Sequence, residues 1–215
     1  MASLTLAKPE LLFLAGYLRQ LTRWSPDAAV RVQSRGKVAG FYGGPLDSVI
    51  TLISLPLAAA VEEFDTVVNA GRVRDLIGDV RGLEAVTELT LPDETSLPPI
   101  LGVLPPTSGW SPPFTTTAGD LAAKIDPQIA ALSASVELLP QAHRDDHIRE
   151  RWATPEWSAL PFGMLHAARA HGFLNLAPVP VGASTNGPWK RLLSPAGQVF
   201  ARVSDGLARL LVVKN

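Results

Sequence analysis

The sequence predicts an α+β fold, with antiparallel β-meanders near both ends of the chain and helices packed on them. Three observations lead to this prediction. An amphipathic helix followed by short β-rich runs stands near the N-terminus, a helix followed by strands recurs near the C-terminus, and an Ala- and Leu-rich helical stretch lies between them. The recurrence hints at two similar lobes, although the residues of the two ends do not align.

The first predicted element is a helix over residues 9–24. Pro9 suits the first helical turn, and Ser25-Pro26 ends the apolar periodicity. A short second helix is expected after Asn69, whose side chain is a good N-cap. The expected strands of this N-terminal part run over 28–34, 37–43, 48–55, 64–68 and 84–91. Arg35-Gly36 is interpreted as the two-residue turn of a hairpin between the first two of these strands.

The middle of the chain, residues 92–117, differs in composition, being rich in Pro, Thr, Ser and Gly. Pro-Pro pairs recur every seven residues, at 98–99, 105–106 and 112–113, which favours extended polyproline-type chain. This Pro-rich connecting strap contains Trp110 and Phe114. They either form a partner-binding or active-site-covering loop, or pack on the body of the protein and join the two lobes.

The C-terminal part is predicted to be helical and then β. The expected helices run over 118–136, 141–152 and 156–173, and the expected strands over 189–194, 198–204 and 207–213. The sequence therefore divides into an N-terminal helix-plus-sheet lobe (1–91), the Pro-rich connecting strap (92–117) and a helical layer with a C-terminal meander (118–215). These parts either form separate lobes or combine into one compact domain.

Composition narrows the classes of function. The chain has 215 residues, of which 47% are hydrophobic, with 19 Lys and Arg against 20 Asp and Glu and a formal net charge of −1. A duplex nucleic-acid binder usually has a basic excess, so nucleic acid is not the expected partner. The densest basic group is Arg19, Arg23, Arg31, Arg35 and Lys37. Because the chain lacks Cys, it has no disulfide, thiolate metal site or thiol nucleophile.

The sequence also gives no sign of membrane insertion. The longest apolar region, residues 49–61, is interrupted by Thr51, Ser54 and Pro56. It falls short of the roughly 20 residues that a membrane-spanning helix needs. The N-terminus lacks the basic start and long apolar run of a signal peptide. We therefore expect no membrane association and a cytoplasmic location.

One cluster has the residue types of a metal site. His143, Asp146, His147 and Glu150 follow helical spacing, so two imidazoles and two carboxylates share a helix face. However, Ile148 marks the buried face of this helix on the opposite side, which favours a solvated charged stripe. We therefore expect no metal and no cofactor, with His143, His147 and Glu150 as the only metal candidates.

Other catalytic signatures are missing from the sequence. His166 and His171 follow on the next predicted helix, but their spacing requires no joint role. There is no Gly-x-Ser-x-Gly nucleophile motif and no phosphate-binding glycine loop. Catalytic residues therefore remain unknown at this stage.

Several stretches together resemble a family of actinobacterial proteins of roughly 200 residues that are uncharacterised and have no assigned function. The matching pieces are Ala28–Gln33 with the Arg35-Gly36 turn, Leu104–Trp110, His171–Leu174, Trp189–Leu192 and Gly197–Arg202. They follow one another along most of the chain. This resemblance implies a cytoplasmic protein with no known catalytic residues.

These observations favour a non-catalytic binding or assembly module that forms a homodimer or binds a protein partner. Trp110 and Phe114 are its candidate interaction surface. One alternative is a small metal-dependent hydrolase that uses the helix face of His143, His147 and Glu150. A third hypothesis is a nucleic-acid-binding regulator.

Overall fold

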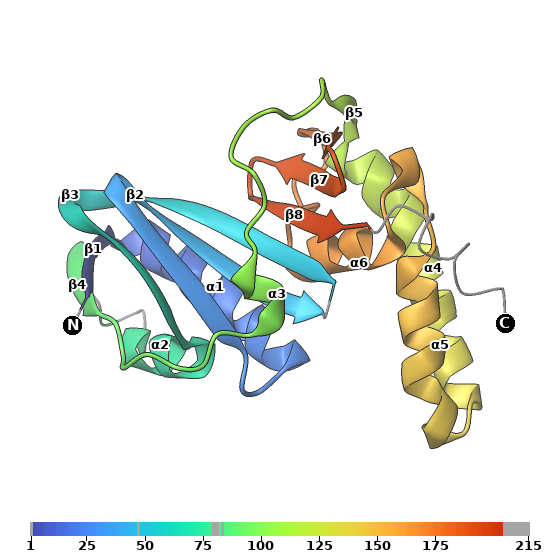
Figure 1. The fold of residues 1–215 in the computed structure, drawn as a ribbon, viewed down its shortest axis with the longest axis horizontal. Coiled ribbons are helices and arrows are strands. Elements are labelled where there is room, and N and C mark those ends of the chain that lie inside the picture. Colours follow the sequence, from blue (N-terminus) through green and yellow to red (C-terminus); the bar gives the residue numbers. More distant parts are fainter. Residues whose placement is uncertain (1, 47, 79–81, 83, 204–215) are drawn as a thin grey trace, which may run out of the picture. The chain divides into compact units, whose positions relative to one another are not determined.

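The computed structural model describes residues 2–46, 48–78, 82 and 84–203, and the chain divides into two compact units, Met1–Leu104 and Pro105–Asn215 (Figure 1). Each unit combines antiparallel strands with helices, which confirms the predicted α+β class. The Pro-rich stretch 92–117 is divided between the units, because the boundary follows Leu104.

Unit 1 opens with strand β1 (Ser3–Ala7) and helix α1 (Lys8–Trp24). As predicted, Pro9 occupies the first turn of α1, and Ser25 is its C-cap residue. Strand β1 was not predicted. It pairs antiparallel with β4 (Val86–Thr90), which lies within the predicted strand 84–91.

Strands β2 (Ala29–Leu46) and β3 (Val49–Asn69) are long and antiparallel. The predicted hairpin at Arg35-Gly36 is wrong, since β2 continues through it. Between the pairs Gly36–Val61 and Val38–Pro56, β2 advances by two residues while β3 advances by five. Gly36 has φ +60°, a conformation that serves an irregularity in a strand pair as well as a hairpin turn.

Ser34 accommodates this irregularity. Its buried hydroxyl donates to the Glu62 carbonyl at 2.8 Å and accepts from the Phe64 amide at 3.1 Å. The predicted strands 48–55 and 64–68 are consequently two parts of the single strand β3.

Helix α2 (Ala70–Ile77) is capped as predicted, because Asn69 Oδ1 accepts from the Arg72 amide at 2.9 Å. This helix packs on α1. A short helix that was not predicted, α3 (Pro99–Gly102), lies in the Pro-rich stretch. The largest fully buried side chains of unit 1 are Leu4, Leu6, Leu11, Leu14, Leu18, Leu21, Phe41, Ile50, Ile53 and Leu101.

Unit 2 has four antiparallel strands in the order β5-β6-β7-β8. They are β5 (Phe114–Thr117), β6 (Pro180–Asn186), β7 (Trp189–Ser194) and β8 (Gly197–Arg202). The prediction for β7 is confirmed. The predicted strand 198–204 starts one residue after the beginning of β8 and runs past Arg202, and residue 204 lies outside the described residues. Strands β5 and β6 were missed, and the predicted strand 207–213 lies outside the described residues.

The helices of unit 2 are α4 (Ala118–Leu138), α5 (Gln141–Ala153), the short 3-10 helix η2 (Trp157–Ala159) and α6 (Phe162–Ala170). The predicted helix 156–173 is thus shorter. Ser158 and Ala159 have positive φ angles, and Pro161 is the N-cap residue of α6. Side chains of α6 are buried against β7 and β8. Among the described residues, no helix combines the length and apolar character needed to cross a membrane.

Candidate interaction surface

The two faces of the unit 2 sheet have different neighbours. Residues that are paired across an antiparallel sheet point to the same face, and Arg191 is paired with both Ser184 and Phe200. This face, here called the Trp110 face, is covered by the Trp110 loop (residues 105–113). The opposite face, which includes Leu192 and Val199, is the helix-covered face.

The Trp110 loop is bound closely to β6. The Ser111 amide donates to the Thr185 carbonyl at 2.9 Å, and the Asn186 side-chain amide donates to the Ser108 carbonyl at 2.8 Å. Gly109 has φ +79°, which disfavours any other residue there. Because proline has no backbone N–H, this Pro-rich loop can donate few hydrogen bonds to a neighbouring strand. The contacts with Thr185 and Asn186 are therefore the ones that hold the loop on β6.

Trp110 packs on this face. Its indole N–H donates to the Pro106 carbonyl at 3.0 Å, and its ring centroid lies 5.8 Å from that of Phe200. The Arg191 guanidinium carbon lies 4.4 Å from the Trp110 ring centroid, in a cation–π contact. The indole ring is therefore held by contacts with both Arg191 and Phe200.

Arg191 is held in place from its own sheet. Its Nε donates to the Ser184 hydroxyl at 3.0 Å, and Ser184 is buried. Within the described part of the chain, Arg191 forms no ion pair with a carboxylate. Partial desolvation lowers the pKa of the Arg191 guanidinium, because no neighbouring acid offsets the cost of burying its charge.

Phe114, the second residue of the predicted interaction surface, lies on the other side of the sheet. It is paired with Ala183, next to Ser184 in β6, so it points to the helix-covered face. Its ring centroid lies 5.6 Å from that of Trp157, and the side chain is 60% exposed. Trp110 and Phe114 consequently belong to different surfaces.

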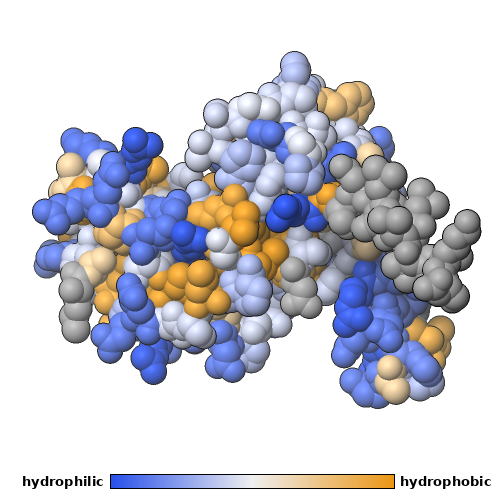
Figure 2. All heavy atoms as spheres, viewed as in Figure 1, coloured by the Kyte–Doolittle hydropathy of each residue, from blue (hydrophilic) through white to orange (hydrophobic). Residues whose placement is uncertain are grey.

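The histidines of α5 lie on a largely solvated helix, which has no buried residue and is hydrophilic in Figure 2. His143 and Glu150 are exposed. His147 is turned partly toward α4, and its Nε2 lies 2.9 Å from the Ser135 hydroxyl. Across the described residues, no group of three or more His, Cys, Asp or Glu side chains could hold a metal ion.

His166 and His171 pack among aromatic side chains. The Trp152 indole N–H donates to His166 Nδ1 at 3.2 Å, and burial lowers the pKa of His166. His171 lies against Phe173, with ring centroids 5.8 Å apart, and burial lowers its pKa to about 4. Both rings are therefore neutral near pH 7 and serve the packing of the helix layer.

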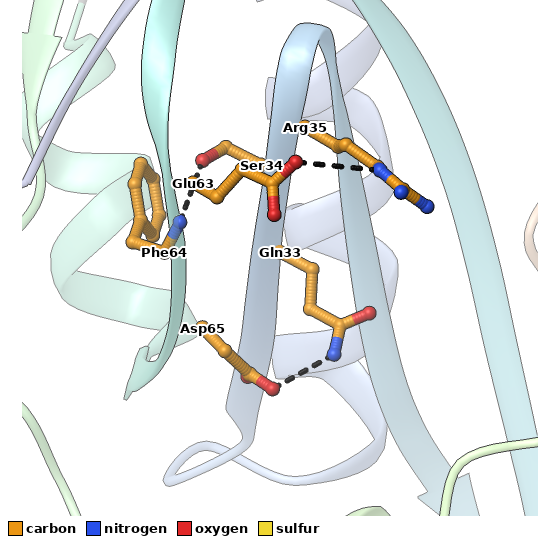
Figure 3. A pocket seen from close by; sticks show the side chains of 6 residues that line it. All are labelled: Gln33, Ser34, Arg35, Glu63, Phe64 and Asp65. Atoms are coloured by element: carbon orange, nitrogen blue, oxygen red, sulfur yellow. Dashed lines mark hydrogen bonds and ion pairs between the residues drawn. The ribbon is translucent and has the colours of Figure 1, made fainter.

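Unit 1 contains a polar hollow of about 520 Å³ between β2 and β3 (Figure 3). Its polar side chains pair with one another: Arg35 forms an ion pair with Glu63 at 3.3 Å, and the Gln33 amide donates to Asp65 at 2.8 Å. Outside the hollow, Arg31 binds the same Asp65 through two hydrogen bonds, which lowers the pKa of the carboxyl group. A carboxylate held ionised in this way is a poor general acid or base at neutral pH.

Comparison with known families divides the chain at the same place as the structure. Residues 1–95 match the model described as domain of unknown function DUF8010, and residues 105–206 match that described as DUF8185. The chain carries two domains of unknown function. No curated protein matches it.

The fold of the chain is similar to that of solved sliding-clamp structures. The DNA polymerase III subunit beta from Pseudomonas aeruginosa has a TM-score of 0.61 and 12% identity, covering 100% of this chain and 68% of that one. The DNA polymerase sliding clamp from Caulobacter crescentus has a TM-score of 0.59 and 12% identity, with 100% of this chain and 69% of that chain covered. The griselimycin-bound sliding clamp from Bartonella birtlesii has a TM-score of 0.59 and 11% identity, with 95% of this chain and 65% of that chain covered. At this identity the likeness establishes a sliding-clamp-like fold.

The sequence pointed to Trp110 but not to the residues around it in unit 2. Arg191, Ser184 and Phe200 come together only through the register of three strands. One sequence signal was present, since residues 157–204 contain no Asp or Glu.

Proposed function

We propose that this chain is a non-catalytic, clamp-like binding and assembly module, located in the cytoplasm. The proposal rests on the likeness of its fold, over the whole chain, to structures described as DNA polymerase sliding clamps. The resemblance of the sequence to uncharacterised actinobacterial proteins agrees with it.

Strand β5 offers an edge for assembly. It pairs with β6 on one side, and no described strand pairs with its other side. The Ala118 amide donates to the Val179 carbonyl directly opposite, and Pro180, which has no N–H, faces Thr117. Since hydrogen-bonded and non-hydrogen-bonded pairs alternate, the N–H of Thr115 points away from β6. A second copy can therefore add a strand at this edge.

Sedimentation equilibrium of the full chain tests this proposal. We expect a discrete oligomer, with Thr115→Pro shifting the distribution to the monomer because it removes the outward N–H without breaking the β5–β6 ladder. Thr115→Val keeps the N–H and should behave like the wild type. A wild-type chain that stays monomeric at every concentration would contradict the assembly role, as would equal behaviour of the two variants.

A second candidate function is nucleic-acid binding, favoured by the helices of unit 1. Helices α1 and α2 pack together and carry five cations, Lys8, Arg19, Arg23, Arg72 and Arg74, against the acids Glu10 and Asp75. Arg19, Arg23 and Arg72 are exposed. By contrast, Arg31 and Arg35 of the basic group noted in the sequence are paired with acids of β3.

Fluorescence anisotropy with labelled duplex DNA at low salt tests this second function. We expect binding that weakens steeply as salt is raised and that the double variant Arg19→Glu/Arg23→Glu abolishes. The double variant Arg31→Glu/Arg35→Glu is the matched control, since its arginines are already neutralised by neighbouring acids. Absence of binding by the wild type at low salt would exclude this function.

A further inference from the structure

The Trp110 face has an unusual charge balance. Residues 95–119 contain no charged residue, and residues 157–204 contain no carboxylate, so the loop and all four strands of the unit 2 sheet lack Asp and Glu. The strands contain three cations, Lys190, Arg191 and Arg202. This sheet therefore has a local positive charge although the whole chain is slightly negative.

Two of the three cations lie on the Trp110 face. Arg202 is paired with Trp189, two residues from Arg191 along β7, so it points to the same side as Arg191. Arg202 is exposed. Lys190 falls between these positions and points to the helix-covered face. The two arginines are thus neighbours on one surface, with no carboxylate on their strands to neutralise them.

The Arg191 guanidinium is held in an orientation that suits binding of a planar anion. Its Nε is occupied by Ser184 and its flat side rests on Trp110, which fixes the plane of the guanidinium. The two terminal nitrogens of the guanidinium form no hydrogen bond with any described residue, so their N–H groups are available to a ligand. A guanidinium in a fixed plane binds a carboxylate through two parallel hydrogen bonds at little cost in side-chain entropy.

The surroundings of Arg191 separate two classes of anionic partner. A nucleic-acid strand would gain affinity by stacking bases on an exposed aromatic face. Trp110 is ill suited to this, because Arg191 lies over its ring and Phe200 packs beside it. An apolar residue, Leu193, lies next to Arg191 on the same face of β7 and is 38% exposed. An arginine beside an exposed leucine complements a segment that carries both acidic and apolar side chains.

We propose that the Trp110 face of unit 2 binds an acidic peptide segment of a partner protein, with Arg191 receiving a carboxylate and Leu193 an apolar side chain. Arg202 adds a second, exposed positive charge at the rim. This inference rests on the proposed role as a binding module and names the chemistry of its partner. It uses a different surface from the β5 edge, so either proposal can fail alone.

The test is a titration of the full chain with a fluorescein-labelled synthetic peptide in which Glu alternates with Leu. Its counterpart with Gln in place of Glu has the same apolar residues and no charge. We expect the Glu peptide to bind about tenfold more tightly than the Gln peptide, the difference coming from charge-assisted hydrogen bonds. Raising the salt concentration should weaken only the Glu peptide.

Variants localise the site. Arg191→Gln should weaken the Glu peptide by about tenfold, whereas Lys190→Gln removes the same charge one residue away, from the helix-covered face, and should leave affinity unchanged. Arg202→Gln, at an exposed position, should produce a smaller loss. In addition, the Trp110 indole N–H resonance, assigned by its loss in Trp110→Phe, should shift on addition of the Glu peptide.

Four results would overturn the proposal. The first two are no binding of the Glu peptide at low salt and equal affinity for the Glu and Gln peptides. The third is an equal loss of affinity in Arg191→Gln and Lys190→Gln. The fourth is that an oligothymidylate binds the Trp110 face more tightly than the Glu peptide does, as followed by the shift of the Trp110 indole resonance. Retention of the oligomer in Arg191→Gln, measured by sedimentation, separates failure of this site from failure of assembly.

Discussion

Replacement of Trp110 by Ala should destabilise unit 2 strongly. The substitution removes a hydrogen bond to Pro106, a ring contact with Phe200 and the cation–π contact with Arg191. Each of these contributes about 0.5–1.5 kcal/mol at a partly buried site, and together they amount to about 3 kcal/mol. This value sits at the lower end of the range for deletion of a large aromatic side chain, as expected for a half-buried one.

The natural tryptophans provide the assay. Trp110, Trp152, Trp157 and Trp189 belong to unit 2, and only Trp24 belongs to unit 1. Urea unfolding followed by fluorescence therefore reports chiefly on unit 2, which matters because two units need not unfold in one step. We expect Trp110→Ala to lower the free energy of unfolding by about 3 kcal/mol. Trp110→Phe, which keeps a ring, should lower it by about 1 kcal/mol.

Phe114→Ala is the matched control. Phe114 is 60% exposed, and its one ring contact with a described residue is that with Trp157. Its removal should cost less than about 1.5 kcal/mol. If Trp110→Ala were no more destabilising than Phe114→Ala, the conclusion that Trp110 anchors its loop on the sheet would be refuted.

Three further predictions concern other parts of the chain. Gly43→Ala should lower stability by about 1–3 kcal/mol in thermal unfolding, because a Cβ there would lie 2.5 Å from a Leu21 methyl group; Gly16→Ala should not, because a Cβ there would meet no described atom within 4 Å apart from the backbone of its own helix and its chain neighbours. Stability should fall as pH drops below the ordinary histidine pKa of 6.5, by a total of about 3 kcal/mol that is complete below the His171 pKa of about 4; urea unfolding across this pH range should show a flatter profile in His171→Leu, and an equal slope in both proteins would contradict the assignment. His147→Ala should leave the metal content of the purified protein unchanged by elemental analysis, because His147 bonds to Ser135, and a stoichiometric metal lost in the variant would revive the hydrolase hypothesis.

Local signals accounted for the elements that the sequence predicted well. Helix α1 follows from Pro9 and the apolar periodicity behind it, and α2 from the capping side chain of Asn69. Strand β7 follows from its β-rich run. Such features depend on residues within a few positions of one another, so they can be read without knowledge of the tertiary structure.

The missed elements depend on distant residues. Strand β6 contains Pro180 and Gly182, which weaken its local β signal. Gly182 is nevertheless suited to the site, because a Cβ there would lie 2.9 Å from Pro113 of the Trp110 loop. Similarly, a turn and a strand irregularity both accept Gly36 with positive φ, and only the pairing with β3 decides between them.

The candidate surface was predictable in part. Aromatic residues in a Pro-rich stretch pointed to Trp110 and Phe114, but which sheet face each occupies depends on strand register. The contact between Arg191 and Trp110 likewise depends on strand register, so the sequence did not predict it. The absence of Asp and Glu from residues 157–204 can be seen in the sequence. It indicates a local positive charge only once the strands within this range are known to form one sheet.

Hydrogen exchange at the Thr115 amide tests the assembly of two copies through the β5 edge most directly. In a single copy this N–H points away from β6 and exchanges freely. We expect its protection to rise with protein concentration, while the Thr116 amide, which faces β6, stays protected throughout. Fast exchange of Thr115 at every concentration would contradict assembly through this edge.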